Sequence, residues 1–103
     1  MVRYEVTLNV KKDIESGFEI WLEKHVKEML TFKGFVRASI HKDLCSNNNI
    51  SIITVNYILI NITYLKLYFN SKSEKMRQDG IDNFPHGFTA SRKIYDDEVE
   101  VNL

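Results

Sequence analysis

Residues 35–60, FVRASIHKDLCSNNNISIITVNYILI, decide how this chain of 103 residues folds. Two stretches rich in apolar and β-branched residues, 35–44 and 50–60, flank the polar segment 45–49. Asparagine tolerates a positive φ and bonds its own backbone, so CSNNN is typical of a turn. Because five residues are too few for the crossover between parallel strands, we predict an antiparallel hairpin.

A strand and a helix precede this hairpin. Apolar and polar side chains alternate in VRYEVTLNV, residues 2–10, which is the pattern of a strand with one buried face. Apolar residues then recur at helical spacing, so we predict a helix from Asp13 or Ile14 to Thr31, with Asp13 as its N-cap. Gly34 suits the left-handed position that commonly closes a helix.

A helix and a strand follow the hairpin. We predict one helix from Asn61, its N-cap, to Gly80, followed by a turn built on Pro85. Residues 88–95 then form a fourth strand. The alternation of apolar residues in 99–103 predicts a short fifth one.

The resulting order, strand–helix–strand–strand–helix–strand, is that of the split βαβ or ferredoxin-like fold. We therefore predict a single α+β domain, residues 1–103, with a four-stranded antiparallel sheet. Two helices would cover one face of this sheet and leave the other bare. Because the core of so small a domain is near the lower limit of self-sufficiency, we expect a second copy of the chain to cover the bare face.

Composition excludes several partners. The chain carries 14 basic and 14 acidic residues, so it has no general attraction to nucleic acid or to an acidic membrane. No segment approaches the roughly 20 consecutive apolar residues of a membrane helix. The N-terminus lacks the apolar run of a signal peptide, and the single cysteine, Cys45, allows no internal disulfide. We expect a cytoplasmic protein without nucleic-acid or membrane partners.

His25 is the first candidate for a functional site. It occupies an apolar position of FEIWLEKHVKEML, residues 18–30. Either its ring packs between helix and sheet with one nitrogen bonded to a backbone carbonyl or a carboxylate, or it points into a pocket as general base or ligand anchor. We favour the packing role. Trp21, one helical turn earlier, is either a core or dimer contact or an aromatic wall of such a pocket.

Three further residues are candidates for ligand binding. Asn56 lies in an apolar strand, where a buried amide needs a partner across the sheet or the dimer, or a ligand. Arg92 shares a strand face with apolar residues, so it either pairs with a carboxylate such as Glu5 or holds an anionic ligand. Tyr68, together with Trp21, would shape an aromatic cavity.

The sequence carries no signature of a bound metal or cofactor. His25, His41 and His86 are far apart and match no metal-binding spacing. There is no phosphate-binding loop, dinucleotide-binding glycine pattern or nucleophile elbow. We expect a colourless protein with no metal and no cofactor.

The stretches VTLNV, WLEKHVKEML and NITYLKLYFNSKSEKMRQDGIDNFPHGFTASRKIY resemble the domain-of-unknown-function family 4286, of the dimeric α/β-barrel superfamily. This resemblance implies a homodimer whose two sheets form a closed barrel with the helices outside. The superfamily includes cofactor-poor and haem-using monooxygenases, isomerases, dye-decolourising enzymes and small effector-binding domains. The family itself has no settled activity, so no catalytic residues are implied.

Three functions follow from these observations. We favour a homodimeric protein that binds a small apolar or amphipathic ligand between helices and sheet. One alternative is a cofactor-poor monooxygenase- or isomerase-like enzyme, with His25 as base or orienting donor. The other is a structural or accessory dimer module.

Overall fold

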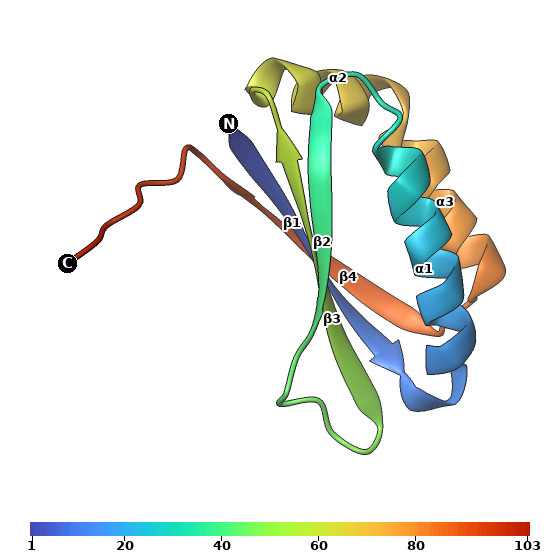
Figure 1. Ribbon diagram of the computed structural model, residues 1–103. Coiled ribbons are helices and arrows are strands. Elements are labelled where there is room, and N and C mark those ends of the chain that lie inside the picture. Colours follow the sequence, from blue (N-terminus) through green and yellow to red (C-terminus); the bar gives the residue numbers. More distant parts are fainter.

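The computed structural model describes residues 1–103 and has two layers, a sheet and the helices on one of its faces (Figure 1). The strands are β1 (Val2–Lys11), β2 (Phe35–Lys42), β3 (Ile50–Leu59) and β4 (Phe88–Tyr95). The helices are a 3-10 turn (Lys12–Ile14), α1 (Glu15–Met29), α2 (Ile62–Ser71) and α3 (Ser73–Asn83).

The strand order is β2-β3-β1-β4, and every neighbouring pair is antiparallel. The predicted ferredoxin-like α+β fold is therefore confirmed. Burial alternates strictly along β3, where every second residue from Ser51 to Leu59 is buried. The register pairs Tyr57 with Tyr4 and Val55 with Val6, so the two central strands present one common apolar face to the helices.

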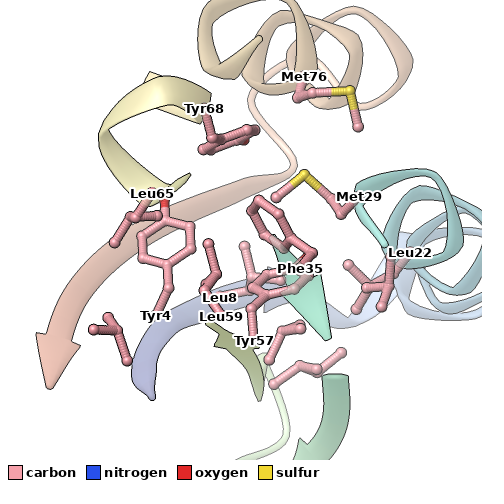
Figure 2. Packing of buried hydrophobic residues seen from close by; sticks show 14 of the residues in the cluster. Tyr4, Leu8, Leu22, Met29, Phe35, Tyr57, Leu59, Leu65, Tyr68 and Met76 are labelled. Carbon is pink, nitrogen blue, oxygen red and sulfur yellow. The ribbon is translucent and has the colours of Figure 1, made fainter. Parts of the chain in front are cut away.

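The core fills the space between this sheet face and the helices (Figure 2). The buried residues of α1 are spaced by three and four, as a helix with one buried side requires: Phe18, Leu22, Val26 and Met29. Aromatic rings contribute much of the core, and the Tyr4 ring packs edge-on against Phe69 with centroids 5.4 Å apart. Each such side chain stabilises the fold by roughly 1.5–3 kcal/mol when it is fully buried.

The first helix begins and ends differently from the prediction. Asp13 is not its N-cap, because Asp13 lies inside the 3-10 turn and Ile14 takes the capping position without a side-chain hydrogen bond. The helix ends at Met29 rather than Thr31. Gly34 does have a positive φ, 87°, but it lies beyond the helix end, where the chain enters β2.

The second predicted helix is two helices. Asn61 caps α2 as predicted, since its Oδ1 accepts hydrogen bonds from the backbone N–H groups of Thr63 and Tyr64 at 3.0 and 3.4 Å. The helix breaks at Lys72, whose φ of −121° is outside the helical range. Ser73, the first residue of α3, is buried and donates a hydrogen bond to the Phe69 carbonyl at 3.0 Å.

Gly80 does not end a helix, because it lies within α3, which continues to Asn83. A Cβ atom at Gly80 would lie 3.0 Å from Cη2 of Trp21 and 3.1 Å from Cζ of Phe88. Glycine at this position therefore lets α3 approach both α1 and β4 closely.

The edges of the sheet hold two further departures from simple alternation. A bulge between Phe35 and Arg37 pairs Phe35 with Leu59 and Ala38 with Tyr57, so Phe35 joins the helix-covered face. The predicted fifth strand is absent, because residues 96–103 form no regular structure and are fully exposed. Figure 1 shows this C-terminal segment extending away from the sheet.

The second face of the sheet carries no helix (Figure 1). The partly exposed residues of β3 lie on it: Ile52, Thr54, Asn56 and Ile58. We refer to this surface as the open face.

Gly34→Ala should lower the free energy of unfolding by about 1–3 kcal/mol, because a residue with a side chain is strained at positive φ. The added Cβ would also lie 2.1 Å from Cγ of Tyr64. Gly17→Ala is the matched control, since its Cβ would meet only Cε1 of Phe84, at 3.8 Å. That variant should gain up to about 1 kcal/mol from helix propensity. Urea unfolding followed by circular dichroism measures both, and equal effects would contradict the argument.

Candidate functional site

A cavity of about 270 Å³ lies between the helices and the covered face of the sheet. Of its 17 lining residues, 13 are hydrophobic, and they come from β1, β3, β4 and all three α-helices. Three lining residues are exposed, namely Arg77, Ile81 and Arg92. Because these three belong to α3 and β4, the cavity opens to solvent between those two elements.

Three tyrosines form the polar part of the apolar wall. Figure 2 shows Tyr4 and Tyr57 on the sheet side and Tyr68 reaching down from α2. Their hydroxyl groups have no hydrogen-bond partner within the chain. Burial raises the pKa of Tyr68 to about 12 and also raises that of Tyr57, so both stay protonated at neutral pH and can donate hydrogen bonds.

His25 and Trp21 form a stacked pair on the α1 side of the cavity. Their ring centroids are 4.6 Å apart, with an interplanar angle of 27°. Trp21 Nε1 donates a hydrogen bond to Oδ2 of Asp79 at 3.2 Å, which ties α1 to α3. Both rings line the cavity.

The hydrogen bond predicted for a packing histidine is absent, since His25 Nδ1 is buried with no partner. Burial lowers the pKa of His25 below its ordinary value of 6.5, against the opposing effects of Asp79 and Glu28. The ring is therefore neutral at neutral pH, and it keeps one nitrogen free to accept a hydrogen bond.

Arg92 lies on the helix-covered face of β4, where its register partner on β1 is Val6. The predicted pair with Glu5 is wrong, because neighbouring residues of a strand point to opposite faces. Glu5 instead accepts a hydrogen bond from the Tyr95 hydroxyl at 3.2 Å. No carboxylate lies within 4.0 Å of the Arg92 guanidinium.

Asn56 lies apart from this cavity. It is on the open face, between Glu5 of β1 and Ser39 of β2 in the register, and its Oδ1 is buried without a partner. Of the five predicted ligand-binding residues, four line the cavity and Asn56 does not: Trp21, His25, Tyr68 and Arg92.

Three polar lining residues, Tyr4, Tyr57 and Arg77, were not among the predicted site residues. The alternation of 50–60 carries a signal for Tyr57, because it places this residue on the apolar side of the strand. No comparable signal exists for Arg77, since the break at Lys72 changes the direction in which its side chain points.

No helix of the chain combines the length and the apolar character needed to span a bilayer. The three histidines lie on α1, on β2 and in the turn before β4. No three histidine, cysteine or acidic side chains come together as a metal-binding group. The expected cytoplasmic location, and the expected lack of a metal, a cofactor and a nucleic-acid partner, stay predictions.

The family model described as "Domain of unknown function (DUF4286)" matches residues 1–97. The chain belongs to this family. No curated protein matches it in sequence. The predicted resemblance to this family is therefore confirmed. The homodimer that the resemblance implies stays a prediction.

Solved structures share the fold at low sequence identity. A "putative antibiotic biosynthesis monooxygenase" from Deinococcus radiodurans is 16% identical, with a TM-score of 0.73 over 100% of this chain and 98% of that one. SnoaB, described as a cofactor-independent oxygenase from Streptomyces nogalater, is 11% identical, with a TM-score of 0.67 over 97% and 96%. A dimeric ferredoxin-like protein from an uncultured marine organism is 12% identical, with a TM-score of 0.64 over 100% of both chains.

The ring resonances of His25 should titrate with a midpoint below pH 6.5, because burial opposes protonation. Asp79→Asn should lower this midpoint further, since it removes a negative charge that favours the imidazolium. Asp82→Asn, on the same helix, is the control and should leave the midpoint unchanged. A pH titration by NMR measures all three. A midpoint above 6.5 would contradict the argument.

The lowered pKa of His25 also makes the free energy of unfolding depend on pH. As the pH falls, the unfolded chain protonates His25 first, so the stability contributed by the neutral ring is complete above about pH 6.5 and declines below it.

Proposed function

We propose that this protein binds one small, largely apolar organic molecule in the cavity between its helices and sheet. The observation that carries the proposal is the cavity itself, 270 Å³ in volume and lined mostly by hydrophobic residues. Close-packed protein interiors hold few voids larger than a water molecule, so a space of this size is not ordinary core packing. It lies near the lower end of ligand pockets, which span roughly 300–1,000 Å³, and this favours a ligand of one or two rings.

The proposal includes a homodimer formed through the open face. The chain exposes 7110 Å². A monomeric protein of this mass exposes about 6,000 Å². The shape is flat, 18 Å in its thinnest direction, because only one face of the sheet is covered. Ile52 and Ile58 are partly exposed apolar residues of the open face that a second copy would bury, and one structure of the same fold is described as dimeric.

A second candidate is an oxygenase that needs no cofactor. The specific observation in its favour is the neutral imidazole of His25, a residue that lines an apolar cavity. A neutral imidazole nitrogen that meets the ligand can remove a proton from an acidic C–H or O–H group, which is the first requirement for activating an organic molecule without a cofactor. SnoaB, which shares the fold, is described as a cofactor-independent oxygenase. Oxygen consumption in the presence of a bound ligand would favour this candidate over simple binding.

Filling the cavity tests the binding function. Ala90 of β4 lines the cavity, so Ala90→Leu places extra carbon atoms in the space of the ligand. We expect calorimetry with 2-naphthamide, a neutral two-ring probe, to show binding to the unchanged protein and at least tenfold weaker binding to Ala90→Leu.

The control is Ala38→Leu, on β2 outside the cavity, which should bind the probe as the unchanged protein does. The melting temperature of Ala90→Leu should not fall. Equal affinity in Ala90→Leu, or binding of neither 2-naphthamide nor its anionic analogue 2-naphthoate to the unchanged protein, would count against the proposal.

Sedimentation at micromolar concentration should give a mass of about twice 12.1 kDa. Ile58→Lys should shift the protein towards the monomer, because it replaces an apolar residue of the open face by a charge. The control Leu67→Lys changes a half-exposed residue of α2 and should leave the dimer intact. A clean monomer of the unchanged protein would remove the dimer from the proposal.

A further inference from the structure

The polar groups around the cavity are nearly all hydrogen-bond donors. Its 17 lining residues include no aspartate and no glutamate, although the chain as a whole carries as many acidic as basic residues. They do include two arginines, Arg77 and Arg92, and three tyrosines. The cavity is therefore electropositive in a protein whose net charge is zero.

Neither arginine has a carboxylate partner. No acidic oxygen lies within 4.0 Å of Arg77 or Arg92. The nearest acidic side chain in sequence to Arg77, that of Asp79, already accepts hydrogen bonds from Trp21 and Asn83. The Arg77 guanidinium lies over the Phe69 ring, 5.9 Å from its centroid. Two cations left without a counter-ion at one opening repel each other, and an anion placed between them would offset that repulsion.

Both guanidinium groups act on the same part of the cavity. The positive charges of Arg77 and Arg92 each lower the pKa of Tyr68, against the larger raising effect of burial. Arg92 acts on Tyr57 in the same direction. The two arginines therefore converge near the buried tyrosines, although they come from α3 and β4.

The tyrosine hydroxyls extend this set of donors into the cavity. The side chains of Tyr4, Tyr57 and Tyr68 are between 1% and 5% exposed, and no hydrogen-bond partner within the chain engages their hydroxyl groups. None of the three hydroxyls is among the fully buried atoms without a partner, so they reach the accessible space of the cavity, where an acceptor of a ligand can bind them.

We infer that the ligand is an organic anion, a one- or two-ring apolar molecule whose carboxylate is held by Arg77 and Arg92 at the opening while its rings lie inside. This inference rests on the proposed binding function and specifies the class of ligand. Arginine binds a carboxylate through two parallel hydrogen bonds, which makes it a strong and directional partner for this group. The three tyrosines face the part of the ligand next to the carboxylate. The rest of the cavity, which methionine and leucine side chains line, holds the rings of the ligand.

A matched pair of probes tests the charge requirement. 2-Naphthoate and 2-naphthamide have nearly the same shape, but only the first is an anion at pH 7.5. We expect calorimetry to show at least tenfold tighter binding of 2-naphthoate to the unchanged protein. The double variant Arg77→Gln, Arg92→Gln should lose that preference.

The control is Lys75→Gln on α3, an exposed residue that does not line the cavity and should retain the preference. Equal affinity for the two probes, or a preference that persists in the double variant, would overturn the inference and leave the binding function intact. Binding of neither probe to the unchanged protein would overturn both.

Discussion

The close contact between α1 and α3 at Gly80 sets the geometry on which the rest of the covered face depends. Because Gly80 has no side chain, the Trp21 ring lies against the backbone of α3, where the distance from a Cβ atom would be only 3.0 Å. The Trp21 hydrogen bond to Asp79 fixes the ring in this place, and the stacked His25 ring follows from it. The same contact brings Arg77, one turn before Gly80, to the edge of the cavity.

The cavity exists because the helices meet the sheet unevenly. α2 packs Leu65 and Tyr68 into the core, and the break at Lys72 then redirects the chain so that α3 contacts α1. Aromatic rings bridge part of the resulting space, with the centroids of Tyr4 and Tyr68 6.3 Å apart. The unfilled part is the proposed ligand site.

The two faces of the sheet carry different side chains. The proposed ligand site lies on the covered face, and the proposed dimer surface is the open face. The covered face holds the tyrosines and Arg92, whose neighbours are apolar. On the open face, Asn56 lies between Glu5 and Ser39 of the neighbouring strands. Ile52 and Ile58 lie on the same face, before and after Asn56 along β3. Arg92 and Asn56 thus belong to different surfaces, although both are polar residues in apolar strands.

The sequence by itself determined the strands, the hairpin and the strand–helix order, because period-two alternation and a five-residue polar loop are local properties of the chain. Local chemistry also identified the cap at Asn61 and the positive φ of Gly34. Only the tertiary structure decided that the chain breaks at Lys72 and that Arg77 joins Arg92. Both depend on how α3 packs against α1, where the contacting residues Trp21 and Asp79 are 58 apart in sequence. The partner of Glu5 was decided in the same way, by the register of β1 and β4, which turns Glu5 away from Arg92 and towards Tyr95. Residue types identified four of the 17 residues that line the cavity, whereas the space between them came from packing, which no local pattern encodes.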